Sequence, residues 1–212
     1  MLSEVLDVVD QIPPGVFIDA TLGGGSHSEQ ILDKRTDIEI VAIDRDHLAL
    51  EATRCKLGRF SQRVRFFHNP FSQIEKILNE ENISSISGFL FDLGVSSPQL
   101  DNAERGFSYR FDGPLDMRMD STQEKTASHL LNNLDRAELK AIIESNSDER
   151  FAARIATSIV ENRPIGNTLE FAELVKNAIP AAARRRGGHP AKRTFQAIRM
   201  EVNKERSELI QG

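Results

Sequence analysis

The sequence has a single cysteine among its 212 residues, Cys55, which excludes an internal disulfide and favours a reducing compartment. No apolar run is long enough to cross a bilayer, so a membrane protein is not expected. Residues 1–4 lack the basic region and apolar stretch of a secretory signal, and we therefore expect a cytoplasmic location. The histidines show no metal-ligand spacing, and no metal site is predicted.

The chain also lacks an overall basic character, because its net charge is −5 at pH 7. One segment differs, since residues 184–193 contain no acid and carry a dense group of cations. A local patch of this kind lets an acidic protein hold a phosphate backbone. The alternative is a solvated, mobile loop. The candidate contacts to nucleic acid are Arg184, Arg185, Arg186, Lys192 and Arg193.

Short apolar runs alternate with helical segments in the first half of the chain. Strands are expected at residues 16–19, 39–44, 64–67 and 89–92. Helices are expected at residues 27–34, 47–57 and 72–81. This alternation predicts βαβ units and a parallel sheet, the α/β class.

Helix signals replace strand signals from about residue 102. Asp135 and Glu138 have the spacing of a capping box, and further amphipathic segments follow. A single amphipathic helix is expected at the end of the chain, with a shared face formed by Phe195, Ile198, Val202 and Leu209. The resulting domain prediction is a core at 1–101, a helical insertion at 102–188, and a return to the core at 189–212.

Polar motifs follow three of the apolar runs. Residues 19–25 (DATLGGG) follow the first run, Asp44 ends the second, and Asp92 ends the fourth before residues 93–99 (LGVSSPQ). Because parallel strands bind ligands beyond their carboxyl ends, these motifs predict a nucleoside-binding cleft with a reaction centre beside it. Asp44 is the candidate ribose ligand. Its alternative role is a helix N-cap, which we assign to Asp46 instead.

The segment at 101–120 joins the two regions and is rich in turn residues and charge. A solvated linker would not need its apolar residues, which are Phe107, Phe111, Leu115, Met117 and Met119. A loop that folds over a cleft needs such anchors as well as polar contacts.

Several runs together resemble one known family. They are residues 2–6 (LSEVL), 19–28 (DATLGGGSHS), 42–46 (AIDRD), 92–101 (DLGVSSPQLD), 104–108 (ERGFS), 112–120 (DGPLDMRMD) and 189–199 (HPAKRTFQAIR). These runs are similar to the MraW (RsmH) family of bacterial methyltransferases, over essentially the whole chain. The resemblance implies a Rossmann-like class I methyltransferase sheet with an inserted helical domain for substrate recognition. It also implies S-adenosylmethionine as cofactor and the N4 amine of a cytosine in 16S ribosomal RNA, or in the small subunit, as substrate. It is compatible with a homodimer.

The resemblance also implies roles for individual residues. The cofactor would be held by Gly25, Ser26 and His27 at its methionine end, Asp44 at its ribose, Phe71 near its adenine, and Asp92 and Gln99 beside its methyl group. The family usually has glycine where this chain has Ser26. For Phe71 the alternative is an ordinary core aromatic.

The exocyclic amine of cytosine is a poor nucleophile because its lone pair is delocalised into the ring. Asp92 is the predicted acceptor of a hydrogen bond from this amine, with Ser96 and Ser97 assisting. For Ser97 and Pro98 the alternative is a turn or helix entry. The target base must be unstacked from the RNA to reach this site, and the helical insertion, residues 104–120 and the cationic segment would hold the RNA.

Family members continue beyond the position of residue 212 with a further strand. We therefore expect the sheet to be incomplete at its C-terminal end, and we expect this chain to bind cofactor weakly. A nicotinamide-dependent oxidoreductase is disfavoured, because residues 23–28 lack the third glycine of the dinucleotide fingerprint. A non-catalytic RNA-binding or assembly protein is the alternative that remains.

Overall fold

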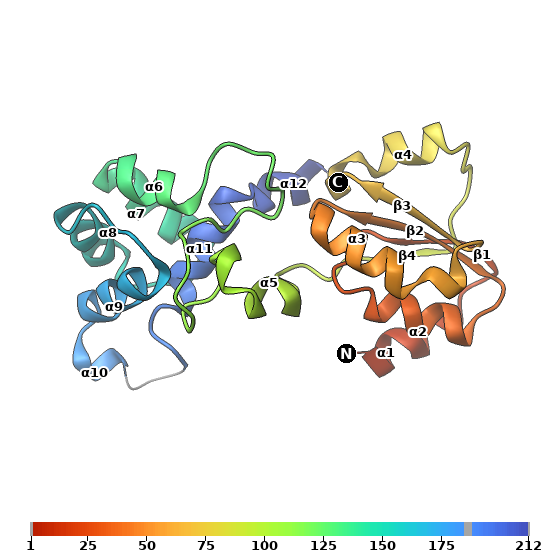
Figure 1. The fold of residues 1–212 in the computed structure, drawn as a ribbon, viewed down its shortest axis with the longest axis horizontal. Helices are drawn as coiled ribbons and strands as arrows, with labels where there is room; N and C mark the ends of the chain where they lie inside the picture. Colours follow the sequence, from red (N-terminus) through yellow and green to blue (C-terminus); the bar gives the residue numbers. More distant parts are fainter. Residues whose placement is uncertain (1, 185–187, 212) are drawn as a thin grey trace. The chain divides into compact units, whose positions relative to one another are not determined.

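A computed structural model describes residues 2–184 and 188–211, and the chain divides into two compact units (Figure 1). The first unit comprises Met1–Pro98 with Glu208–Gly212, and the second comprises Gln99–Ser207. Within the described ranges, no helix combines the length and apolar character needed to cross a membrane.

The first unit is built on a parallel sheet. Its strands are β1 (Gly15–Asp19), β2 (Ile38–Asp44), β3 (Val64–His68) and β4 (Gly88–Leu90). They lie in the order β3-β2-β1-β4, so the chain moves outward from β1 and then returns to its other side. The predicted strands are confirmed, although β4 ends at Leu90, before Asp92. The reversal of strand order at β1 marks the edge where ligands bind in open sheets of this kind.

Helices cover both faces of this sheet (Figure 1). On one face lie α1 (Leu2–Val9), α2 (Ser26–Lys34) and α3 (His47–Lys56), followed in the chain by the short η1 (Gly58–Phe60). On the other lie η2 (Phe71–Gln73) and α4 (Ile74–Glu80). Successive strand residues alternate between the two cores, so that Phe17 and Ile40 face α1–α3 whereas Ile18 and Val41 face α4. This arrangement confirms the predicted helices and the Rossmann-like α/β fold.

The second unit is helical among its described residues. Its elements are α5 (Ser97–Asp101), whose first two residues belong to the first unit, η3 (Ala103–Arg105), α6 (Ala127–Asn133), α7 (Arg136–Asn146), α8 (Ala152–Glu161), α9 (Thr168–Ala178), α10 (Ala181–Arg184) and α11 (Lys192–Val202). Helix α7 packs against α8 and α11, and α9 packs against α8. The capping box of Asp135 and Glu138 at the start of α7 is confirmed.

The prediction of one long helix at the end of the chain is wrong. Helix α11 ends at Val202, and α12 (Glu205–Gln211) starts after a break at Lys204, whose φ of 50° is left-handed. The break follows Asn203, which is fully buried and is held by the backbone of the 101–120 segment. Leu209 is consequently 53% exposed and does not extend the buried face of Phe195.

The position of α11 also differs from the expected domain ranges. This helix packs against α6 and α7, so residues from 189 onward belong to the second unit, and the chain re-enters the first unit only at Glu208. The physical reason is an apolar face: Phe195 stacks on Phe171 of α9 with ring centroids 4.9 Å apart.

The segment at 101–120 packs within the second unit. Its apolar residues Phe107, Leu115, Met117 and Met119 are buried, whereas Phe111 is exposed. Gly106 has a φ of 69°, and a Cβ at this position would lie 2.0 Å from the carbonyl oxygen of Pro114. Glycine is therefore required where the segment folds back on itself.

Candidate active site

The glycine loop at residues 21–25 lies at the carboxyl end of β1 and leads into α2. Gly25 has a φ of 66° and precedes the first residue of the helix. Its amide donates to the carbonyl of Leu22 at 2.8 Å, which closes a tight turn. A Cβ on Gly25 would lie 2.3 Å from Cγ2 of Thr53, so both the backbone angle and the close packing exclude a side chain.

Two residues of α3 hold this loop from behind. The buried Thr53 donates from its hydroxyl to the carbonyl of Gly23 at 2.8 Å. Lys56, one helical turn further on, donates to the carbonyl of Gly24 at 3.1 Å and reaches the Ser26 hydroxyl at 3.4 Å. Sequence reasoning missed both residues, because the only available signal was their spacing of three on a helix.

Asp19 is a third supporting residue, and it was not assigned a role from the sequence. Its side chain is 1% exposed and accepts hydrogen bonds from the Ser28 hydroxyl at 2.6 Å and the Thr21 amide at 3.3 Å. Burial raises the pKa of Asp19 to about 6, against the lowering effect of these hydrogen bonds. Asp19 therefore joins the end of β1 to α2 beneath the loop.

Asp44 connects the end of β2 to the same loop. One carboxylate oxygen accepts from the Gly23 amide at 2.7 Å, and the other accepts from the Asp46 amide at 2.8 Å. Burial raises the pKa of Asp44. Each oxygen has a further lone pair, so the carboxylate can still accept from two hydroxyls. Asp46 accepts from the Leu48 amide at 3.1 Å and is the N-cap of α3, as predicted.

Asp92 lies beyond the strand on the other side of β1. In the sheet register Asp19 pairs with Ala42 and with Leu90, so Asp44 and Asp92 each follow two residues after a partner of Asp19. At ordinary strand spacing, the two backbone segments that carry these acids are about 10 Å apart, because β1 lies between them. The Asp92 amide donates to the Thr21 hydroxyl at 2.6 Å.

The side chain of Asp92 is open to solvent and faces a histidine. It is 46% exposed, and its Oδ2 lies 3.9 Å from Nδ1 of His27 at the start of α2. The glycine loop thus has Asp44 on one side and Asp92 on the other, with His27 beside Asp92. The structure brings these predicted residues together at one edge of the sheet.

The remaining predicted site residues have mixed surroundings. Phe71 contacts Phe91 edge to face at 5.4 Å and packs on the α4 side of the sheet, as a core aromatic does. Ser97 is exposed and begins α5, so the helix-entry alternative is correct for its backbone. Ser96 is half-buried, whereas Gln99 is buried and belongs to the second unit. The ligand roles of these residues stay predictions.

The cationic segment is described in part, because Arg185 and Arg186 lie outside the described residues. Arg184 ends α10, and its guanidinium donates to the carbonyls of Ile179 at 2.7 Å and Asn177 at 3.1 Å. Lys192 and Arg193 are exposed at the start of α11. These two line a pocket of about 260 Å³ together with Arg184.

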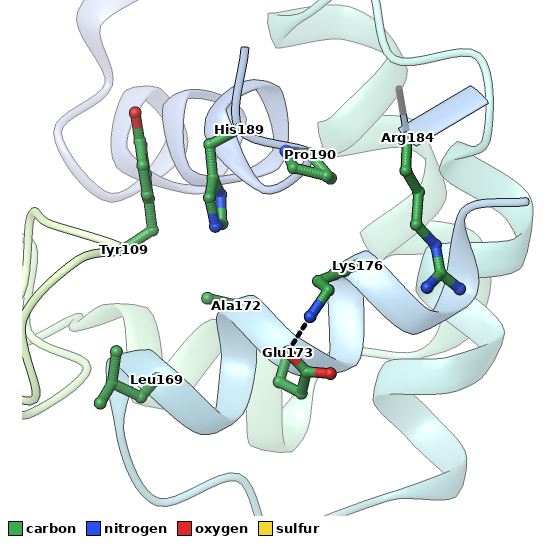
Figure 2. A pocket seen from close by; sticks show the side chains of 8 residues that line it. All are labelled: Tyr109, Leu169, Ala172, Glu173, Lys176, Arg184, His189 and Pro190. Carbon is green, nitrogen blue, oxygen red and sulfur yellow. Dashed lines mark hydrogen bonds and ion pairs between the residues drawn. The ribbon is translucent and has the colours of Figure 1, made fainter. Parts of the chain in front are cut away.

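A larger pocket of about 520 Å³ also lies within the second unit (Figure 2). Its polar lining residues are Tyr109, Glu173, Lys176, Arg184 and His189, and its apolar ones are Leu169, Ala172 and Pro190. Because Arg184 borders both pockets, the described cations of residues 184–193 share one region of the second unit.

Comparison with known proteins identifies the family of the chain. A model of the MraW methylase family matches residues 1–211. A protein of Halothermothrix orenii is 50% identical over 97% of this chain and 67% of its own length. One of Thermobifida fusca is 50% identical over 99% of this chain and 65% of its own length.

A relative from Salinispora tropica is 46% identical over 99% of this chain and 57% of its own length. All three relatives are named ribosomal RNA small subunit methyltransferase H. The chain thus spans between 57% and 67% of the length of these relatives. The match over almost every residue shows that the chain belongs to the MraW methylase family of methyltransferases.

Proposed function

We propose that this chain takes part in transferring a methyl group from S-adenosylmethionine to the N4 amine of a cytosine in 16S ribosomal RNA. Family membership supports a methyltransferase, and the names of the relatives support ribosomal RNA as the substrate. The observation that carries the proposal is the pair of acids, Asp44 and Asp92, on the two sides of the glycine loop.

The residues of the first unit fit the proposed cofactor. Gly24 is exposed, and a Cβ built on it would meet nothing within 4 Å, so there is open space beside the loop. Gly25, Ser26 and His27 would contact the methionine end. The carboxylate of Asp44, already fixed by the amides of Gly23 and Asp46, would accept from the ribose hydroxyls. When bound, the cofactor supplies an electrophilic methyl group on a sulfonium.

Further cofactor contacts follow from the family resemblance. Phe71 would lie near the adenine. Phe71 already stands at the carboxyl end of the sheet, following β3 and Pro70. This assignment adds an adenine contact to those proposed for the glycine loop and Asp44.

Asp92 would act on the cytosine. Its exposed carboxylate can accept a hydrogen bond from the exocyclic amine, which localises the nitrogen lone pair and directs it at the methyl group. The same negative charge stabilises the positive charge that develops on the nitrogen as the bond forms. The Thr21 hydroxyl fixes the Asp92 backbone, and the hydroxyls of Ser96 and Ser97 would assist. After transfer, the extra proton on nitrogen leaves to Asp92 or to water.

The second unit would hold the RNA. Arg184, Lys192 and Arg193 are positioned to neutralise phosphates, and we extend this role to Arg185 and Arg186. The substrate is ribosomal RNA or the small subunit that contains it, which places the reaction in the cytoplasm.

The test is transfer of radiolabelled methyl groups from S-adenosylmethionine to 16S ribosomal RNA and to small-subunit particles, followed by digestion to nucleosides. We expect the label in N4-methylcytidine. Asp92→Ala should abolish the label, whereas Asp7→Ala on the exposed face of α1 should match the unchanged protein. RNA binding without any label in N4-methylcytidine would contradict the proposal and would favour a non-catalytic RNA-binding protein.

A further inference from the structure

The larger pocket of the second unit has a composition that the proposed methyl transfer does not explain. Its volume of about 520 Å³ is in the range of small-molecule sites. None of the residues proposed to bind cofactor or to act on the cytosine lines it. Figure 2 shows two rings, Tyr109 and His189, standing next to each other at one end and the Arg184 guanidinium at the other, with Lys176 between them.

The two rings form a fixed aromatic platform. Tyr109 and His189 are stacked with centroids 4.4 Å apart and an interplanar angle of 12°. Tyr109 also contacts Phe195, which it meets edge to face at 5.7 Å. His189 is held by a hydrogen bond from the Ala191 amide to its Nδ1 at 3.2 Å. The rings are therefore ordered before any ligand binds.

The imidazole of His189 is suited to stacking and to donating a hydrogen bond. Its pKa is lowered, mainly by desolvation and further by the charges of Lys176 and Arg110, while Glu173 opposes them. The ring is therefore neutral at physiological pH. Since Nδ1 accepts from the Ala191 amide, Nε2 carries the proton and is a donor.

Charged groups at the other side of the pocket complement this platform. Lys176 pairs with Glu173 at 2.8 Å on the surface of α9, so a cation and a carboxylate face the pocket together. Arg184 is anchored by its bonds to two backbone carbonyls, and a guanidinium has five N–H donors, more than those bonds use. An anchored guanidinium is the side chain best matched to a phosphate.

We propose that this pocket binds one unpaired nucleotide of the RNA substrate, a neighbour of the cytosine that is methylated. The base stacks on His189, extending the ring pair, and the phosphate binds Arg184 and Lys176. Glu173 accepts from an amino group on the base edge. Stacking of unpaired bases on aromatic side chains beside cations is the usual way in which proteins hold single-stranded RNA. The inference rests on the proposed function, because that function makes RNA the ligand.

The experiment measures binding of fluorescein-labelled, overlapping single-stranded decamers of 16S ribosomal RNA to the whole chain by anisotropy. His189→Ala should weaken binding of the best decamer by about 5- to 100-fold, the range found for single stacked bases. His189→Phe should retain most of the affinity, because it keeps a flat ring. Lys140→Met removes an exposed ion pair with Glu144 elsewhere in the same unit and is the matched control, with unchanged affinity expected.

A second arm tests the base itself. Each nucleotide of the decamer is replaced in turn by an abasic one. The unchanged protein should lose affinity at one position other than the methylated cytosine, and His189→Ala should be insensitive at that position. A uniform response at every position, equal losses in His189→Ala and Lys140→Met, or no decamer bound would overturn the inference. Binding of nucleoside monophosphates alone, with no preference for RNA, would also overturn it.

Failure of this inference can be told apart from failure of the proposed function. A protein that forms N4-methylcytidine but shows no position-specific abasic effect contradicts the nucleotide pocket alone. A protein that shows the abasic effect but forms no N4-methylcytidine contradicts the methyl transfer alone. Affinity for S-adenosylmethionine should be the same in His189→Ala and the unchanged protein, because His189 lies in the second unit, and equal circular dichroism spectra of the two proteins show that the variant is folded.

Discussion

Asp19 offers a quantitative test of how the glycine loop is supported. Its carboxyl is 1% exposed at the end of β1, and burial raises its pKa from 3.8 to about 6. Because the folded-state pKa is above the unfolded value, the stability linked to this group is fully present below the unfolded pKa. That stability is lost as the pH rises through the folded value. Asp19→Asn removes the titration but keeps the shape and the hydrogen-bonding capacity toward Ser28 and the Thr21 amide.

The expected magnitude follows from the size of the shift. Each pKa unit corresponds to about 1.4 kcal/mol, so ionising Asp19 in the folded chain costs about 3 kcal/mol in total. Part of that change occurs below pH 4. Between about pH 4 and about pH 7.5, the free energy of unfolding of Asp19→Asn should therefore rise by about 2 kcal/mol relative to that of the unchanged protein.

The assay is urea unfolding followed by circular dichroism, with both proteins measured at the same series of pH values. Taking the difference between the two proteins cancels the contributions of all groups that titrate alike in both. A difference that stays constant from pH 4 to pH 7.5 would contradict this prediction, because it would mean that Asp19 does not titrate in this window. A difference of the opposite sign would mean that the folded state stabilises the ionised carboxylate.

Three further variants test other parts of the structure. Thr53→Val removes the hydrogen bond to the Gly23 carbonyl but keeps the methyl group packed on the loop. Calorimetry should show that this variant binds S-adenosylmethionine about tenfold more weakly than the unchanged protein. Thr53→Ser keeps the hydroxyl and should bind normally. Replacing Lys192 and Arg193 together by Gln should make the negative slope of log affinity against log salt for single-stranded RNA shallower by about 1.4. An unchanged slope would count against RNA binding by the cationic segment. Asn203→Ala leaves the buried backbone of the 101–120 segment without its partners and should lower the free energy of unfolding by about 1–3 kcal/mol, measured by urea denaturation.

The sheet was predictable because its strands carry a local signal. Each strand is a short apolar run with turn residues around it, and Asp44 marks the end of β2 as the sequence indicated. The N-cap at Asp46 was also predictable, since a capping side chain bonds to an amide only two residues away. Features that depend only on neighbouring residues in the sequence can be predicted without knowledge of the tertiary structure.

Other features depend on contacts between distant residues. The break between α11 and α12 could not be read from the regular spacing of Phe195, Val202 and Leu209. It occurs because Asn203 bonds to a backbone more than eighty positions earlier in the chain. The re-entry of the chain at Glu208 follows from the same packing of α11.

The supports of the glycine loop show the same limit within the first unit. Thr53 bonds to a carbonyl thirty positions earlier, and Lys56 to one thirty-two positions earlier. A threonine and a lysine three residues apart on a predicted helix carry no distinctive signal. The sequence identified the loop and its acids, whereas the residues that hold the loop in place became visible only when α3 was placed beside it.

Asp44 and Asp92 are proposed to have different roles, since Asp44 would hold the cofactor ribose and Asp92 would act on the amine. The most direct test measures S-adenosylmethionine affinity by calorimetry and methyl transfer at saturating cofactor for Asp44→Ala and Asp92→Ala side by side. We expect Asp44→Ala to weaken cofactor binding strongly, and Asp92→Ala to bind cofactor normally while forming no N4-methylcytidine. Normal cofactor affinity in Asp44→Ala, or normal transfer by Asp92→Ala, would contradict the account.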